Sequence, residues 1–245
     1  MKQLWKTCFG DDNAFIDGFF SRFGDAAVVF DGETLCAMAF FLPATYLQPD
    51  GAEQSAAYLY AVCTAPEQRR KGFCRMACAA AEAYAKQNGA DFTFLYPAVS
   101  SLARMYEKLG YRMCFTAEET TVSAQPQPKT RIRTLTAEEY ADLRQLQLWS
   151  SCIVWPVNAF EQQAAQGQLL CIEREDRFAL AAVERCEEEL FFKEYLGDRD
   201  LAGAAVAQLG AKNATLRGTG NKPFAMAKAL TDKPLPTGFA GLVFD

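Results

Sequence analysis

The sequence predicts an α/β (α+β) protein built as two domains in tandem, and three observations carry this prediction. An apolar β-prone run, a basic turn containing Gly72 and a helical segment rich in Ala, Met and Cys follow one another between Ala57 and Ala81. Two prolines among polar residues, from Gln125 to Lys129, form the best linker in the chain. Beyond the linker the order of strand and helix patterns weakly repeats that of the first half, and 245 residues suffice for two ordinary domains.

The first half begins with helical patterns and a hairpin. Apolar residues recur with a helical period between Leu4 and Phe23, interrupted at Gly10-Asp11-Asp12, which predicts a helix pair with Asp11 or Asp12 capping the second helix. The dipeptide Asp31-Gly32 between two apolar runs predicts a β-hairpin. Two further strands are predicted, one that follows Tyr111 and ends at Phe115, and one over 119–123.

The second half is predicted from similar signals. Residues 131–136 are expected to form a strand, followed by a helix that begins with a capping box of Thr136 and Glu139. The remaining predicted elements are strands at 169–173, 178–186, 190–196 and 214–217, helices at 201–209 and 224–230, and a buried strand at the end of the chain.

The basic turn after the strand of Ala57 lies where proteins commonly bind an anion. A basic loop at the start of a helix directs backbone N–H groups and the positive end of the helix dipole at one point. The turn lacks the Gly-Lys-Ser/Thr of a P-loop and the three glycines of a dinucleotide fingerprint. Its pattern is Pro66-x-x-Arg69-x-x-Gly72-x-Cys74, for which an ordinary basic surface turn is the alternative.

This loop resembles the pyrophosphate loop of the GCN5-related N-acetyltransferase (GNAT) superfamily, which binds acetyl-CoA there. Arg69 and Gly72 match the family pattern, whereas Cys74 stands where Gly or Ala is usual and Arg70 where Gly is common. A second match is the run from Tyr106 to Tyr111, Y-E-K-L-G-Y, which is similar to the family helix that carries a tyrosine general acid.

The second match departs from the family at one position. Val99 stands where family members often have an asparagine that contacts pantetheine. Ser100 and Ser101 are the candidate replacements for that contact.

The resemblance implies two tandem GNAT-like domains, each a mixed, mostly antiparallel twisted sheet flanked by helices. Residues 1–124 would be the acyl-CoA-binding catalytic domain and residues 130–245 a degenerate domain, similar to acetyltransferases of the enhanced-intracellular-survival type without their third domain. The second copy is expected to be degenerate because two aspartates, Asp198 and Asp200, occupy its phosphate loop and would repel a diphosphate. The glycine-rich run 217–222 is interpreted as a turn rather than a phosphate site.

The implied activity is direct transfer of an acetyl group from acetyl-CoA to a primary amine of a small molecule or peptide. The alternatives are a non-catalytic acyl-CoA-binding module and a structural or partner-binding protein with a vestigial fold. In the family the central strand has a bulge, and its free backbone groups pair with pantetheine. The implied cofactor-binding residues are Ala61, Val62, Cys63, Arg69, Arg70, Lys71, Gly72, Phe73, Cys74 and Arg75.

The implied catalytic residues are Tyr106, as the general acid, and Val62, whose N–H would polarise the thioester carbonyl. The general base stays open, because no acidic residue lies between Ala57 and Pro66. The end of the chain at Asp245 is the hypothesised carboxylate at the acceptor pocket, and an ordinary last strand is the alternative.

Composition restricts the remaining function classes. The net charge of −5 argues against nucleic acid as a partner, and no apolar run approaches the roughly 18 residues of a membrane span. The chain has no histidine, which excludes a Ser-His-Asp triad, leaves Cys63 and Cys74 without a histidine to activate a thiolate, and disfavours a catalytic metal. Nine cysteines without a C-x-x-C pair predict reduced thiols in a cytoplasmic protein. The acceptor amine, the acyl-chain length and the oligomeric state stay open.

Overall fold

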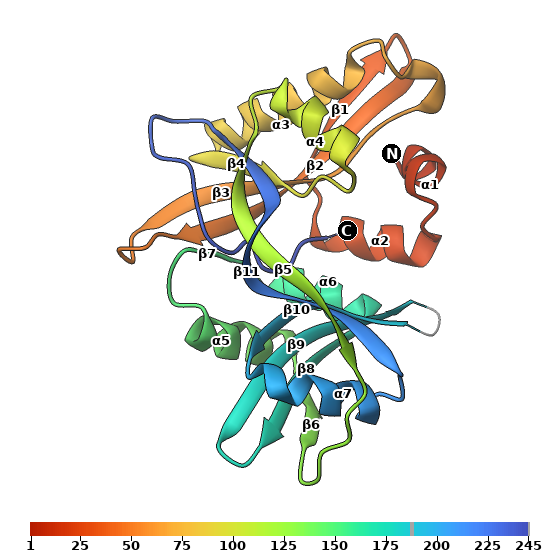
Figure 1. Cartoon of the computed structure of the whole chain (residues 1–245). Coiled ribbons are helices and arrows are strands. Elements are labelled where there is room, and N and C mark those ends of the chain that lie inside the picture. Colours follow the sequence, from red (N-terminus) through yellow and green to blue (C-terminus); the bar gives the residue numbers. More distant parts are fainter. Residues whose placement is uncertain (187–188, 245) are drawn as a thin grey trace.

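The computed structural model describes residues 1–186 and 189–244, and its strands form one continuous eleven-stranded sheet (Figure 1). The strands are β1 (Ala26–Asp31), β2 (Thr34–Leu47), β3 (Glu53–Thr64), β4 (Phe92–Leu95), β5 (Arg112–Ser123), β6 (Arg131–Thr134), β7 (Cys152–Val154), β8 (Gln168–Arg174), β9 (Arg177–Cys186), β10 (Glu189–Gly197) and β11 (Asn213–Ala229). Their order is β1-β2-β3-β4-β11-β10-β9-β8-β6, while β5 pairs with β11 and β7 with β2. Only β3–β4 and β10–β11 are parallel among the described pairs. The predicted α/β (α+β) class with a mixed, mostly antiparallel sheet is confirmed.

Helices cover the sheet on both faces. They are α1 (Lys2–Phe9), α2 (Asn13–Arg22), α3 (Phe73–Gln87), α4 (Ser100–Glu107), α5 (Ala137–Gln147), α6 (Val157–Gln166) and α7 (Ala202–Gln208), with short 3-10 turns at Pro66–Gln68 and Arg199–Leu201. Side chains alternate between the faces of a strand, so Met38 and Phe40 of β2 join the core under α1 and α2, whereas Ala37 and Ala39 join the core under α3.

The predicted helix pair and hairpin of the first half are confirmed. Asp12 caps α2, because its Oδ1 accepts a hydrogen bond of 2.8 Å from the N–H of Phe15. Trp5 of α1 is 1% exposed, and its ring packs against those of Phe19 and Phe40 at 5.0 and 5.3 Å between centroids. These aromatic contacts hold α1 and α2 against β2 and β3.

The second half also begins as predicted. Thr136 and Glu139 form the predicted capping box at the start of α5, and β8, β9 and β10 form three consecutive antiparallel strands. Sequence reasoning did not identify β7 or α6, which lie between α5 and β8.

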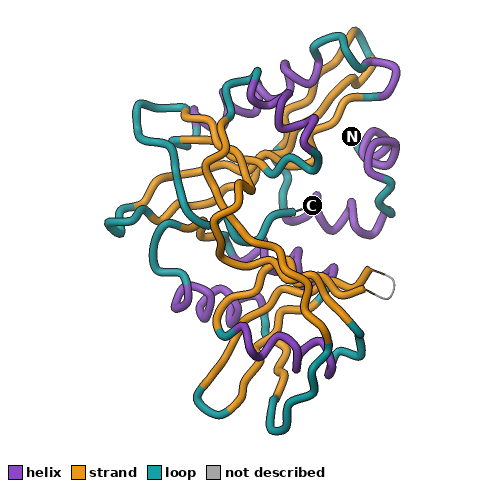
Figure 2. The backbone as a smooth tube through the Cα atoms, in the orientation of Figure 1, coloured by secondary structure: helices purple, strands orange, loops and turns teal. Residues whose placement is uncertain are grey.

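Two long strands, β5 and β11, run from one half of the sheet to the other (Figures 1 and 2). The two strands predicted up to Phe115 and over 119–123 are one continuous strand, β5. The run 217–222, predicted to be a turn, lies within β11, where a register shift between Gly218 and Lys222 forms an irregularity opposite β5.

The helix predicted at 224–230 is wrong, since Phe224 to Ala229 form the end of β11. Ala, Met and Lys favour a helix locally, but here they pair with two strands at once: Met226 lies opposite Leu95 of β4 and Met113 of β5. Non-local pairing in a buried sheet overrides local helix propensity.

The end of the chain returns to the middle of the molecule, where Figures 1 and 2 show it beside α2. The predicted last strand is reduced to isolated bridges, one of them between Phe239 and Cys152, although residues 239–244 are buried. Gly241, with φ of 73°, lies so close to a buried ion pair that a Cβ would be 2.2 Å from Nη2 of Arg144. Only glycine fits there without displacing the pair.

The predicted division into residues 1–124 and 130–245 stays a prediction, but strand pairing corrects one consequence of it. The last part of β11 and the segment after it, placed in the second domain by that division, complete the sheet and core of the first half. The reason is that β4 needs a partner on its far edge, and β11 supplies it.

Two further predictions are that the cysteines are reduced thiols and that the chain has no membrane span. The eight cysteines whose side chains are described are all free thiols. In the described part of the chain, each helix is too short or too polar to span a bilayer.

Candidate active site

The site lies where β3 and β4 separate. Their parallel pairing ends at Tyr58 and Phe94, so the edge of β3 beyond Tyr58 has no strand partner on that side among the described residues. Between the pairs Met38–Cys63 and Phe40–Tyr60, β3 has Ala61 and Val62 where β2 has one residue, and Ala61 adopts φ of 47°. This is the bulge that the resemblance implied, and it turns the backbone toward the opening.

A cavity of about 680 Å³, here called the loop cavity, extends from this opening to the basic loop. It has four cationic lining residues, Arg69, Arg70, Arg75 and Lys108, and no acidic ones among the described residues. The other lining residues are Cys8, Phe9, Val62, Cys63, Thr64, Gly72, Phe73, Cys74, Val99, Ser101, Leu102, Met105, Tyr106 and Leu109. A cavity with this charge favours an anionic ligand.

The N-terminus of α3 adds backbone donors to the loop cavity. Gly72 is the N-cap residue and provides no side-chain cap, and the first helical bond is donated by Met76 to the carbonyl of Gly72. The N–H groups of residues 73–75 therefore have no acceptor within the helix. They and the helix dipole form an anion site of the predicted kind.

The loop conformation explains why glycine is common at the position of Arg70. Gly72 has φ of 91° and Arg70 has φ of 66°, in the left-handed region that glycine adopts readily and other residues rarely. Arg70 therefore brings a charge to the cavity at a conformational cost of order 1 kcal/mol.

Tyr106 of α4 lies between the loop cavity and a second cavity of about 310 Å³, here called the aromatic cavity. Tyr106 is 6% exposed, and burial raises the pKa of its hydroxyl well above the usual value, with the nearby thiols of Cys78 and Cys74 adding to the shift. The hydroxyl stays protonated at neutral pH, as a proton donor must. No described residue makes a hydrogen bond with it.

The aromatic cavity and the loop cavity are adjacent and share part of their lining. Phe9, Val62, Leu102 and Tyr106 line both. The remaining lining residues of the aromatic cavity are Trp5, Asp11, Phe15, Tyr58, Leu59, Tyr60, Ala61, Leu95, Tyr96, Ala98, Gln166 and Phe244.

Most of the predicted site residues come together, and two are placed differently. Ala61 lines the aromatic cavity and not the loop cavity, while Lys71 lines neither, and its ammonium donates to Oε1 of Gln68 at 2.8 Å. Of the two serines proposed in place of the asparagine, Ser101 lines the loop cavity. Asp245 lies outside the described residues, but the preceding residue, Phe244, lines the aromatic cavity.

Sequence reasoning missed the contributions of α1, the α1–α2 turn and α6 to the aromatic cavity, whereas it did hypothesise that the end of the chain lies at an acceptor pocket. They lie far from the motif in sequence, and the apolar pattern of α1 indicates only that it packs. The charge of Asp11 in a turn between apolar helices was the one available signal, and it was interpreted as a cap.

The thiols at the site are poor nucleophile candidates. Burial raises the pKa of Cys63 far above its usual value, while a hydrogen bond with Cys78 lowers that of Cys74. The lowered pKa of Cys74 depends on this neighbouring thiol and involves no cationic base. Among the described residues no cluster of three or more metal-ligating side chains is present.

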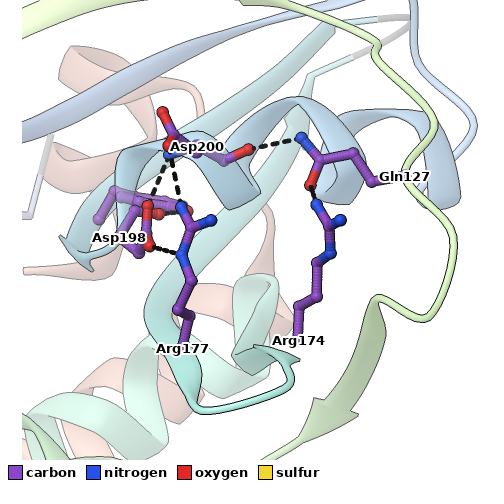
Figure 3. Close-up of polar contacts among 6 residues, drawn as sticks. Gln127, Arg174, Arg177, Asp198 and Asp200 are labelled. Carbon is purple, nitrogen blue, oxygen red and sulfur yellow. Dashed lines mark hydrogen bonds and ion pairs between the residues drawn. The ribbon is translucent and has the colours of Figure 1, made fainter.

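The second half has a different arrangement where its phosphate loop would lie (Figure 3). Asp198 and Asp200 both accept hydrogen bonds from Arg177, which holds the pKa of Asp198 below its usual range. Gln127 donates to the carbonyl of Asp200 at 2.9 Å. Two carboxylates that share one guanidinium do not attract a diphosphate, which supports the prediction that this copy is degenerate.

Comparison with known proteins agrees with this geometry. Residues 1–114 match the family model described as an acetyltransferase (GNAT) domain. No curated protein matches the sequence.

Solved structures of the same fold cover almost the whole chain. A GCN5-related N-acetyltransferase from Anabaena variabilis has a TM-score of 0.72 at 14% identity, over 94% of this chain and 70% of its own. Eis1 from Mycobacterium abscessus has a TM-score of 0.62 at 13% identity, over 91% of this chain and 63% of its own. A tandem GNAT protein from the clavulanic acid biosynthesis pathway has a TM-score of 0.51 at 9% identity, over 91% of this chain and 90% of its own.

The bulge in β3, the separation of β3 from β4 and these likenesses define a protein of GNAT fold in tandem arrangement. The match over residues 1–114 identifies this part of the chain as a GNAT acetyltransferase domain. The chain spans about two thirds of the length of the first two of these relatives.

Proposed function

We propose that the chain is an N-acetyltransferase that transfers an acetyl group directly from acetyl-CoA to a primary amine. The observation that carries this proposal is the meeting of two cavities at Val62 and Tyr106, one basic and one aromatic. A thioester bound in one cavity and an amine bound in the other would then both lie against Val62 and Tyr106.

The loop cavity fits acetyl-CoA, which would supply an activated acetyl group as a thioester. Its four cations, with no carboxylate in the described lining, suit the diphosphate and the further phosphate of the nucleotide. Arg69, Arg70 and the N–H groups of residues 73–75 would hold the diphosphate, and the free edge of β3 would pair with pantetheine as an added strand.

Val62 and Tyr106 have distinct roles in this proposal. The N–H of Val62, at the bulge, would donate to the thioester carbonyl, and one such donor contributes about 3 to 4 kcal/mol in other enzymes. The hydroxyl of Tyr106 would give its proton to the departing thiolate, which leaves as the CoA thiol.

The general base stays a prediction. Phe244 is held near the site, since the hydroxyl of Tyr58 donates to its carbonyl oxygen at 3.3 Å. This position supports the proposal that Asp245 reaches the acceptor cavity, where its carboxylate would take the proton that the ammonium group must lose before it attacks the thioester. Turnover by an Asp245→Asn variant equal to that of the wild type would contradict a role for the side chain.

Titration with acetyl-CoA and thiol release test the proposal separately. Binding together with amine-dependent release of the CoA thiol would support the enzyme. Binding without release from any amine in a broad panel would instead support the alternative of a non-catalytic acyl-CoA-binding module.

We expect Arg69→Glu to weaken acetyl-CoA binding by at least about 1.4 kcal/mol, or tenfold, because it places a carboxylate beside the diphosphate. Calorimetric titration measures the effect. Lys86→Glu, the same charge reversal in the last turn of α3, is the control and should bind acetyl-CoA like the wild type. Equal losses in the two variants would show that net charge, and not the loop, determines affinity.

A further inference from the structure

The lining of the aromatic cavity identifies a class of acceptor. Eight of its lining residues are aromatic, namely Trp5, Phe9, Phe15, Tyr58, Tyr60, Tyr96, Tyr106 and Phe244. Asp11 is the only charged residue among the described lining residues. A carboxylate in an aromatic enclosure matches a ligand with an ammonium group and an apolar body.

The carboxylate of Asp11 is held in place by its neighbour. It lies in the turn between α1 and α2, and its Oδ2 accepts a hydrogen bond of 2.7 Å from Nε1 of Trp5. Trp5 is fixed by its own packing, and it lines the cavity too. No described residue donates to the other oxygen, Oδ1, so one oxygen is positioned by the protein while the second can accept from a ligand.

The size and polarity of the cavity restrict the acceptor further. About 310 Å³ is at the lower end of the range of ligand pockets, which excludes large acceptors as complete occupants. Apart from Asp11 and the tyrosine hydroxyls, Gln166 is the only polar side chain in the described lining. An amino sugar would therefore bury several hydroxyls with few partners among the described residues, and a diamine would place a second ammonium group where most of the lining is apolar, which is costly.

We propose, on the basis of the proposed function, that the acceptor is a small arylalkyl primary amine whose ammonium group is bound by Asp11 and whose ring lies among the aromatic side chains. Asp11 is then the residue that selects a cation, and the rings select the apolar body. This assigns Asp11 a role in binding, distinct from the cap role of Asp12 next to it.

The test compares three proteins and three amines. The wild type, Asp11→Asn and Asp12→Asn are assayed for thiol release from acetyl-CoA with 2-phenylethylamine, putrescine and glucosamine. Asparagine at position 11 can still accept the Trp5 hydrogen bond, so only the charge is lost. Asp12→Asn is the matched control, because asparagine is also a good cap and Asp12 lines neither cavity.

We expect 2-phenylethylamine to have the highest kcat/KM by at least about tenfold. Asp11→Asn should raise its KM by about tenfold to a hundredfold, the range for a hydrogen bond to a charged group. The dissociation constant of acetyl-CoA should not change, and Asp12→Asn should behave like the wild type. A preference for putrescine or glucosamine, or an unchanged KM in Asp11→Asn, would overturn the inference while the proposed function stands.

Direct binding separates this inference from the proposed function. If no amine supports thiol release, the transferase proposal fails, and 2-phenylethylamine is then titrated into each protein by calorimetry. Binding to the wild type that weakens in Asp11→Asn alone would still support the site. Absence of binding to the wild type would overturn it.

Discussion

Replacing Tyr106 by Phe should lower turnover by about 100-fold or more while leaving acetyl-CoA affinity unchanged. The substitution removes only the hydroxyl, which makes no hydrogen bond with a described residue, and it keeps the ring that packs against Tyr111 at 5.7 Å between centroids. The packing of α4 should therefore persist. Loss of a general acid commonly costs about 100- to 10,000-fold in rate. The measurement is kcat by thiol release together with the acetyl-CoA dissociation constant.

Tyr84→Phe is the matched control for this experiment. Tyr84 lies on α3, is 44% exposed and lines neither cavity, so loss of its hydroxyl should not change turnover. Equal turnover in wild type and Tyr106→Phe would reduce Tyr106 to a packing residue and favour the non-catalytic module.

The pH dependence of turnover offers an independent check on Tyr106. A tyrosine acts as a proton donor only while neutral, and burial raises the pKa of this one above the usual value of about 10. Because the shift is upward, ionisation of Tyr106 should not reduce kcat below about pH 10. A decline in kcat near neutral pH that disappears in Tyr106→Phe would contradict this assignment of the pKa.

The loop cavity could largely be predicted from the sequence because its residues are close together in the chain. Arg69, Gly72 and Cys74 belong to one strand–loop–helix unit, and Tyr106 to the next helix. Local patterns report such units well, since each residue's place follows from the periodicity and turn chemistry of its own segment.

The aromatic cavity could not be predicted, because it is assembled from distant segments. Asp11, Tyr58 and Phe244 meet only after β11 has inserted between β4 and β10 and the chain has turned back. The insertion itself was missed at 224–229, where local helix propensity conflicts with the demand of β4 for a partner. The pairing of β11 depends on the edge of β4, which lies about 130 residues earlier in the chain. The periodicity of a segment carries no information about so distant a partner.

The segment after β11 is fixed by one buried ion pair. Oε2 of Glu194 accepts from Nε of Arg144 at 2.9 Å and from the hydroxyl of Tyr140 at 3.0 Å. Its Oε1 accepts from Nη2 of Arg144 at 2.9 Å and from the N–H of Leu242 at 3.0 Å. The side chains of Arg144 and Glu194 are 2% and 0% exposed. Burial opposes the charge on Arg144, but the carboxylate of Glu194 raises the pKa of Arg144 above its usual range, so the guanidinium stays charged.

Glu194→Gln should therefore lower the free energy of unfolding by about 3 to 5 kcal/mol, since it leaves a buried guanidinium without a counter-charge. Stabilities of 5 to 15 kcal/mol are typical, so this is a large share, and for a chain of this size Tm should fall by roughly 10 °C. Urea unfolding and calorimetry measure both quantities. Glu139→Gln is the matched control: it retains a capping box at an exposed position and should have little effect.

Glu194→Gln should also weaken binding of the amine in the aromatic cavity. Leu242 is two residues before Phe244, so loosening its N–H contact with residue 194 should displace a wall of the aromatic cavity and raise the KM of the amine more than that of acetyl-CoA. Replacing both partners, as Arg144→Met with Glu194→Leu, removes the uncompensated charge and should recover part of the lost stability. The amine KM should stay raised in the double variant, because leucine at position 194 cannot accept the hydrogen bond from Leu242. Full recovery of both properties would show that the charge alone matters, and that the ion pair does not position the end of the chain.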